Sequence, residues 1–214
     1  MVVLGGRGKA FCAGGDLTWM KRMAGYSPDE NRRDAMALAT MLRTLRELAK
    51  PTIARVHGAA YAGGLGLVCA CDLVVAEPAA TFCLSEVRIG LVPATISPYV
   101  IQALGLQAAK RYMLTGEPFP AAQAHRLGFV HEMCEAGMID ATVEPLCAAL
   151  KACGPMAIKE TKALIAAVAN RSLDDGLLAD TAERIARVRA SAEGREGVSS
   201  FLEKRKPAWL AASL

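Results

Sequence analysis

Two short stretches of glycine and alanine are the part of this sequence best suited to chemistry. They cover residues 8–17 (GKAFCAGGDL) and residues 57–67 (HGAAYAGGLGL). Residues this small let bare backbone N–H groups come close to a ligand. Two such groups that converge on one carbonyl oxygen would stabilise negative charge developing there, and donors arranged in advance are often the largest single catalytic term. Together, the stretches predict an oxyanion hole.

The alternative interpretation is that each stretch only makes a tight turn. Neither stretch is a phosphate-binding P-loop, because no GK[ST] follows, and neither fits GxGxxG ahead of an acidic ribose partner. Each stretch does follow a short predicted strand and precede a helix. This order would aim the N–H donors of both turns at the same edge of a parallel sheet.

Glu86 is the best candidate for a proton-transferring group. It lies in the mostly apolar segment 82–93 (FCLSEVRIGLVP). Burial raises the pKa of a carboxyl group, which suits proton exchange with carbon near neutral pH. The alternative is a surface glutamate paired with Arg88.

The residues after the first glycine turn have structural explanations as well as functional ones. Asp16 is predicted to cap the start of a helix. Trp19 and Met20 form an apolar cluster that is either ordinary core or the wall of an acyl pocket. The three histidines lack acidic or cysteine partners at metal-ligand spacing, so no metal site is predicted. No GxSxG motif is present, which argues against a serine hydrolase.

The composition predicts a globular protein of one α/β domain, with or without an appendage. Of its 214 residues, 53% are hydrophobic and 21% charged, enough for a sizeable core. The net charge of +4 is dispersed, and without a run of five basic residues nucleic-acid binding is not expected. The seven cysteines are irregularly spaced without CxxC, which favours free thiols in a reducing compartment. Without a signal peptide or a bilayer-length apolar run, we expect a soluble cytoplasmic protein that does not enter a membrane.

Strands and helices alternate along the first half of the sequence. The predicted elements are a strand at 2–4, a helix that Ser27 caps and that ends near Lys50, a strand at 52–56, a buried helix at 65–71 and a strand at 72–76. This order implies parallel crossovers with ligands at the strand ends. After Pro93 the patterns are helical apart from a short strand at 129–131. We therefore predict an α/β core over residues 1–120 and a helical region over residues 121–214. Since the chain begins on a buried strand, an upstream part is expected to be missing.

At this point the motifs resemble a known family, the crotonase (enoyl-CoA hydratase/isomerase) superfamily. Residues 9–17, 50–72, 84–93 and 193–207 carry the resemblance, in matching order and spacing. It implies an α/β fold, a crotonase-like spiral of ββα units, with a helical C-terminal region that makes trimers or pairs of trimers. The family usually has one more strand–strand–helix unit before the first motif, which supports a missing N-terminal unit.

The resemblance also implies roles for single residues. Ala13 and Gly63 match the positions whose N–H groups hold the thioester oxygen of an acyl-CoA. Glu86 matches the glutamate that exchanges a proton with the α-carbon. Coenzyme A (CoA) enters as part of the substrate, with no separate cofactor, and Lys9, Ala10 and Phe11 lie where the family lays CoA against the backbone. The full set of predicted substrate-binding residues is Lys9, Ala10, Phe11, Asp16, Trp19, Met20, Gly64, Gly66, Phe201 and Lys204. Of these, Phe201 and Lys204 lie on a C-terminal helix that in the family often completes the CoA site, sometimes in a neighbouring subunit.

One position departs from the family pattern. The hydratases usually carry another glutamate three residues after the oxyanion glycine, where this sequence has Gly66. Three interpretations follow: a hydratase that uses Glu86 alone or with a substrate carboxylate, a double-bond isomerase with Glu86 as its single base, or a catalytically inactive acyl-CoA-binding relative. RNA binding is a distant further alternative.

The sequences of residues 84–91 (LSEVRIGL) and 96–99 (ISPY) are most similar to those of bacterial hydratases of methylglutaconyl-CoA or carboxylated terpenoid-CoA. The prediction is therefore reversible hydration of a short, branched or carboxylated enoyl-CoA, as in fatty acid metabolism.

Overall fold

The computed structural model describes residues 1–211, which form two compact units. The first unit contains Met1–Leu48 and Thr52–Glu144, and the second contains Ala49–Pro51 and the chain from Pro145 onward. The first unit holds the sheets and both glycine-rich stretches. Residue 120, where the sequence patterns change, lies inside it.

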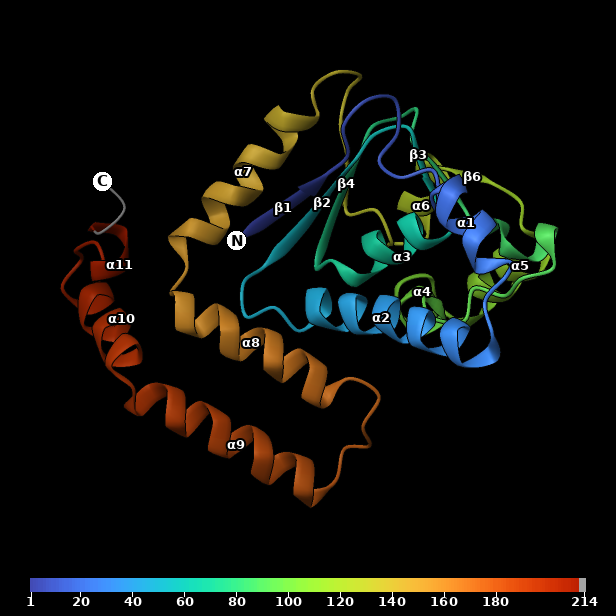
Figure 1. Ribbon diagram of the computed structural model, residues 1–214. Helices are drawn as coiled ribbons and strands as arrows, with labels where there is room; N and C mark the ends of the chain where they lie inside the picture. Colours follow the sequence, from blue (N-terminus) through green and yellow to red (C-terminus); the bar gives the residue numbers. More distant parts are fainter. Residues whose placement is uncertain (212–214) are drawn as a thin grey trace. The chain divides into compact units, whose positions relative to one another are not determined.

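A parallel four-stranded sheet forms the framework of the first unit (Figure 1). Its order is β1 (Val2–Gly5), β2 (Thr52–Val56), β4 (Leu73–Ala76) and β7 (Glu132–Met133), and all neighbours are parallel. The first three strands confirm the predicted positions, but β1 was expected to be buried and is instead exposed at Val2 and Val3, because it forms an edge of the sheet. The last strand begins just after the predicted 129–131, because Phe129 and Val130 instead turn into the core and follow α6.

A second sheet, which the sequence patterns did not predict, lies next to the glycine-rich turns. It contains β3 (Ala59–Tyr61), β5 (Thr81–Cys83) and β6 (Phe119–Pro120), with β3 and β5 parallel and β6 antiparallel to β5. Strands of two or three residues are too short to show alternation. The second glycine-rich stretch therefore contains a short strand as well as a turn.

This unit has helices at both ranges that the sequence predicts, near 27–50 and 65–71. Its helices are α1 (Leu17–Met23), α2 (Pro28–Arg46), α3 (Gly63–Ala70), the 3₁₀ helix η1 (Ser85–Ile89), α4 (Ser97–Leu104), α5 (Leu106–Thr115) and α6 (Ala121–Arg126). Ser27 caps α2 as predicted, in a capping box with Glu30. The helix ends at Arg46, a turn before the predicted end, and a short connector leads to Pro51.

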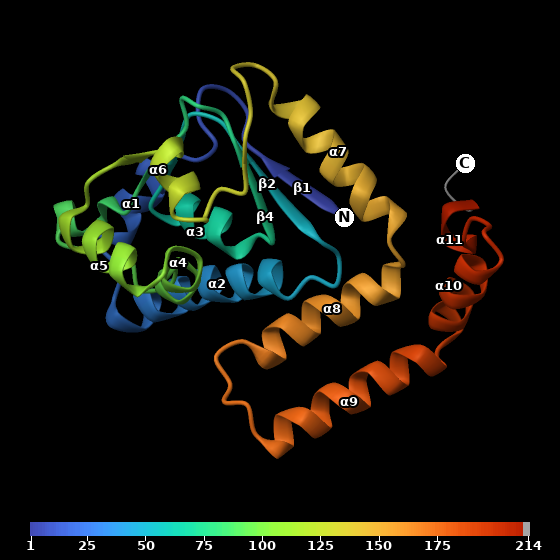
Figure 2. The ribbon, with the colours of Figure 1, turned by 180° about the vertical axis from the view of Figure 1, so that it is seen from behind.

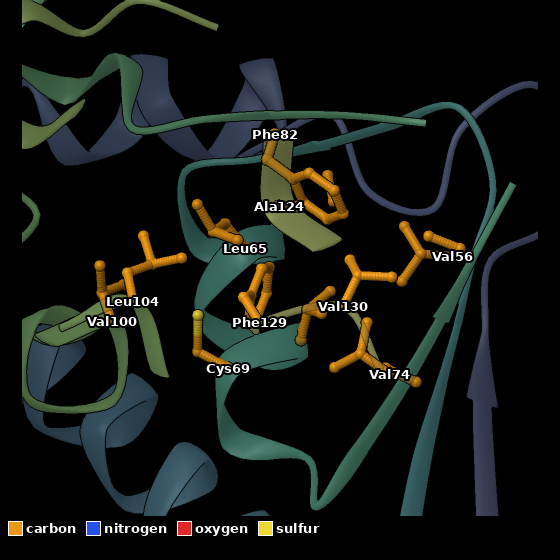
Figure 3. Close-up of a cluster of buried hydrophobic side chains, with 14 of the residues drawn as sticks. Val56, Leu65, Cys69, Val74, Phe82, Val100, Leu104, Ala124, Phe129 and Val130 are labelled. Carbon is orange, nitrogen blue, oxygen red and sulfur yellow. The ribbon is translucent and has the colours of Figure 1, made fainter. Parts of the chain in front are cut away.

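Helix α3 lies in the middle of the core, which explains why it is apolar all round. It packs against α2 and α4. Figure 3 shows side chains from α3, the strands and the later segments gathered into one cluster: Val56, Leu65, Cys69, Val74, Phe82, Val100, Leu104, Ala124, Phe129 and Val130. This packing holds the first turn of α3 rigidly, which matters because that turn starts at Gly63.

The second unit is helical, as predicted for the C-terminal region. Helix α7 (Ile139–Ala152) passes into it at Pro145, and α8 (Pro155–Val168), α9 (Asp175–Ala190), α10 (Ala192–Leu202) and α11 (Ala208–Ala211) follow. Helices α8 and α9 run side by side (Figure 2) and pack on each other. Both also contact α10. The Glu193 carboxylate accepts hydrogen bonds from the N–H groups of Met156 and Ala157, which caps α8. No helix within residues 1–211 is long and apolar enough to cross a membrane.

Candidate active site

The first glycine-rich loop is docked onto the second by backbone hydrogen bonds. The Phe11 N–H donates to the His57 carbonyl at 2.9 Å, and the Cys12 N–H donates to the Ala59 carbonyl at 3.0 Å. The Tyr61 N–H in turn donates to the Cys12 carbonyl at 2.9 Å. Residues 11 and 12 thus pair with β3 and the residues before it, so two stretches far apart in sequence form one backbone surface.

Gly64 lets the loops approach each other more closely than any other residue would. A Cβ atom built on Gly64 would lie 2.6 Å from the Cys12 carbonyl oxygen and 2.7 Å from the Cys12 Cβ. Ala13 follows Cys12 directly, and Gly63 precedes Gly64 directly. The two residues predicted as N–H donors are therefore the immediate neighbours of a close backbone contact.

The N–H groups of Ala13 and Gly63 make no hydrogen bond within the described chain. Gly63 is the first residue of α3, where a helix leaves its N–H groups without intrahelical acceptors and carries partial positive charge. A Cβ built on Gly63 would meet no atom within 4 Å, so the space beside its Cα is open. Neither N–H group is used by the fold, which is the property that the predicted donors require.

Ala62 holds a strained backbone conformation just before this turn. Its φ of 50° and ψ of −122° lie where residues with a side chain are rarely found. The Ala62 N–H donates to the Cys83 carbonyl at 2.8 Å, which ties the start of α3 to the end of β5. Strain of this kind often marks functional sites. Here it turns the chain so that α3 can begin at Gly63.

Glu86 lies on η1, three residues after the carbonyl that holds Ala62. Its side chain is partly buried, and its Oε2 atom is shielded from solvent without a hydrogen-bond partner among residues 1–211. Burial raises the pKa of the Glu86 carboxyl group above its ordinary value, and a backbone hydrogen bond only partly opposes this shift. Arg88 is exposed, and Glu86 forms no ion pair in the described part of the chain. The alternative of a surface Glu86–Arg88 pair is therefore wrong.

Gly66, where the resemblance expects a second glutamate, is closed by a neighbouring side chain. A Cβ built on Gly66 would lie 2.2 Å from the Cγ2 atom of Ile96 and 2.8 Å from its Cβ. Ile96 is 1% exposed and anchored at the start of α4. No side chain fits at position 66 unless Ile96 moves.

Asp16 and Trp19 support the first loop from its C-terminal side. Asp16 caps α1, as predicted, by accepting a hydrogen bond from the Trp19 N–H at 2.8 Å. The Trp19 indole N–H donates to Asp34 on α2 at 3.0 Å, and the ring lies so close to Gly15 that a Cβ there would be 2.9 Å from it. Met20 also reaches the space beside Gly15. No pattern in the sequence indicates the contact with Asp34.

The predicted CoA-binding residues have different environments. Lys9 is exposed and Ala10 is partly buried, whereas the Phe11 side chain belongs to the core cluster. Phe11 can therefore meet a ligand only through its backbone. Phe201 and Lys204 belong to the second unit, where the Phe201 side chain is 81% exposed, and their part in CoA binding stays a prediction. Within residues 1–211, no group of histidine, cysteine and acidic side chains could hold a metal ion.

This combination of a parallel α/β unit, two docked glycine-rich loops and a helical C-terminal region places the protein in the class with the crotonase fold. A crystal structure of an enoyl-CoA hydratase from Shewanella pealeana superposes with a TM-score of 0.94 at 44% identity, over 97% of this chain and 78% of the other. Pseudomonas aeruginosa AtuE gives 0.88 at 36% identity, over 93% and 77%. The mevalonyl-coenzyme A hydratase sidH of Aspergillus fumigatus is 33% identical over 216 residues, which cover 100% of this chain and 79% of sidH.

The family model for enoyl-CoA hydratase/isomerase matches residues 1–211. The chain belongs to the enoyl-CoA hydratase/isomerase family.

Proposed function

We propose that the protein hydrates an enoyl-CoA thioester reversibly, through an enolate held by backbone N–H groups. The observation that carries this proposal is the pair of unused N–H groups on Ala13 and Gly63, whose loops are docked together. The Ala62–Cys83 hydrogen bond links this pair to the segment that carries Glu86.

In the proposed reaction, the thioester oxygen accepts hydrogen bonds from both N–H groups. Water adds its oxygen to the β-carbon, which gives the enolate, and Glu86 then gives a proton to the α-carbon. The added water then loses a proton to the Glu86 carboxylate, which restores the acid. The raised pKa of Glu86 supports this role, because it increases the protonated fraction near neutral pH. The two N–H groups stabilise the negative charge on oxygen while the α-carbon is not yet protonated.

The closed position at Gly66 limits the substrates that we propose. With Ile96 against Gly66, this position cannot supply a second carboxylate to orient water. An acyl chain with its own carboxylate would replace the missing group, which favours the carboxylated members among the short, branched or carboxylated substrates that we propose. The residue pattern similar to methylglutaconyl-CoA hydratases supports the same class, and the relative sidH is a hydratase of mevalonyl-coenzyme A.

The second candidate function is double-bond isomerisation of an enoyl-CoA, and the same Gly66–Ile96 packing favours it. Glu86 would remove a proton from one carbon and return it two carbons away, a task for a single base. We further propose that the protein works in the cytoplasm as a trimer or hexamer, joined through the helical region, with CoA entering only as part of the substrate.

An absorbance assay at the enoyl-thioester band separates these functions. A panel of short, branched and carboxylated 2-enoyl-CoA substrates is expected to lose absorbance as water adds to the conjugated bond. With 3-enoyl-CoA substrates, a rise in absorbance would identify the isomerase instead. CoA binding without any absorbance change across the panel would leave only an inactive acyl-CoA-binding relative.

A further inference from the structure

His57 makes a hydrogen bond that the proposed reaction does not use. It follows β2 directly, and its Nε2 atom lies 3.0 Å from the Gly8 carbonyl oxygen. A carbonyl oxygen can only accept, so Nε2 must carry the hydrogen. Nδ1 is shielded from solvent and has no partner within residues 1–211. A hydrogen on Nδ1 would be a buried donor without an acceptor, so a hydrogen on Nε2 and none on Nδ1 fits this site.

The same residue also holds the other side of the loop. The His57 carbonyl accepts the Phe11 N–H at 2.9 Å. His57 thus binds the backbone just before and just after Lys9 and Ala10. These two residues continue a turn that begins at Gly8, and we refer to them as the Lys9–Ala10 turn. Gly58, with a φ of 58°, lies under this turn, and a Cβ there would be 2.3 Å from the Lys9 carbonyl oxygen. The Lys9–Ala10 turn therefore rests directly on residues 57 and 58.

The turn presents chemistry that suits a phosphate-bearing ligand. The Lys9 side chain is exposed, so its ammonium group is free to approach an anion while the backbone below it is held in place. We infer that His57 is a positioning residue, which holds the Lys9–Ala10 turn through the Nε2–Gly8 hydrogen bond in the shape that binds the CoA part of the substrate. The inference rests on the proposed function, because it takes CoA as the ligand.

Two substitutions at position 57 distinguish the loss of this hydrogen bond from the loss of the imidazole ring. The amide nitrogen of His57→Gln can occupy the place of Nε2 and donate to Gly8. The amide nitrogen of His57→Asn reaches only the place of Nδ1, where no acceptor is present. Isothermal titration with free CoA, together with kcat and KM for an active substrate, gives the readout, and thermal unfolding checks the fold of each variant.

We expect His57→Asn to weaken CoA binding and to raise KM about tenfold, the effect of about one lost hydrogen bond, while kcat stays within about twofold. His57→Gln is expected to stay within about twofold of the wild type in all three quantities. The inference is overturned if the Asn variant binds CoA like the wild type, if kcat falls while KM is unchanged, or if the Gln variant is as weak as the Asn variant.

CoA binding by the wild type distinguishes a failure of this inference from a failure of the proposed function. A wild type that binds no CoA overturns the proposed function and this inference with it, whereas a wild type that binds CoA beside an unaffected Asn variant overturns the inference alone. If the Asn variant does not fold, the nitrogen NMR spectrum of wild-type His57 supplies a second test. Hydrogen on Nε2 with a bare Nδ1 supports the inference, and the opposite tautomer overturns it.

Discussion

Two glycines one turn apart on helix α3 serve opposite purposes. A Cβ built on Gly63 would meet no atom within 4 Å, and the Gly63 N–H makes no hydrogen bond within the described residues. At Gly66 the missing side chain is replaced by Ile96, whose Cγ2 would be 2.2 Å from an added Cβ. The space beside Gly63 is open, whereas the space beside Gly66 is filled by the Ile96 side chain. Helix α3 thus supplies a backbone donor to the proposed site but no carboxylate. Glu86 is therefore the single carboxyl group that we assign to this site.

The substitution Glu86→Gln tests whether Glu86 is the single acid–base group of the site, and it has the largest expected effect. The amide has nearly the same shape but cannot exchange a proton with carbon. Because position 66 offers no substitute, turnover should fall at least about a thousandfold, near the upper part of the range for general acid–base catalysis. Steady-state assays measure the loss, and CoA titration should show unchanged binding. Undiminished turnover would remove Glu86 from the mechanism.

The substitution Gly63→Pro removes the backbone N–H donor of Gly63. Proline at the first position of a helix costs no intrahelical hydrogen bond, but it disfavours the ψ of −122° at the preceding Ala62, so some loss of stability is expected. Loss of one oxyanion donor should lower kcat about 10²–10³-fold. Kinetic assays measure this, with thermal unfolding as the control for folding. A folded variant with normal kcat would exclude the Gly63 N–H from the reaction.

The substitution Gly66→Ala should harm stability rather than chemistry, which sharpens the contrast with Gly63. Its methyl group would meet Ile96, and such overpacking destabilises the folded state by about 1–3 kcal/mol. Denaturant unfolding of Gly66→Ala, alone and combined with substitutions of Ile96, measures the free energy of unfolding.

Substitutions of Ile96 test whether contact with this side chain causes the destabilisation by Gly66→Ala. Ile96→Ala removes the Cγ2 methyl, so the added methyl at position 66 should cost less in this background. Ile96→Val keeps the branched methyl and should give no relief. Equal costs of Gly66→Ala in both backgrounds would contradict the proposed packing.

The smallest expected effect is a change in the pH dependence of stability. Because the folded-state pKa of Glu86 is raised, the folded protein holds this proton more tightly than the unfolded chain. Glu86 therefore favours folding at low pH, and its contribution is lost as pH rises from its ordinary value of 4.5 through the raised pKa. Glu86→Gln should thus be slightly more stable than the wild type at pH 7. This advantage should shrink towards pH 4 in thermal unfolding, and a constant difference would argue against the buried carboxyl group.

The parts of the fold that have local signals could be predicted from the sequence. The Ser27 capping box, the strand at Thr52–Val56 and the apolar run of α3 each depend on neighbours close in sequence. The two glycine-rich turns could be paired for the same reason, since each lies between a strand and a helix. Glu86 was identified because its own segment is apolar.

The rest of the site depends on contacts between distant residues. Ile96 lies 30 positions after Gly66, and nothing in either segment indicates that they touch. The hydrogen bond from Trp19 to Asp34 and the contact of His57 with Gly8 likewise join separate elements. The short strands β3, β5 and β6 were missed because two or three residues carry too little periodicity to be recognised.

Exchange of α-protons in D₂O is the most direct measurement of the central claim, that the two backbone donors and Glu86 act on one thioester. A saturated short-chain acyl-CoA has no double bond to hydrate or move, so exchange of its α-protons reports enolate formation alone. We predict that proton NMR will show exchange with the wild type, and little or none with Glu86→Gln or Gly63→Pro. Exchange at the wild-type rate in either variant, or none with a wild type that binds the thioester, would contradict the account.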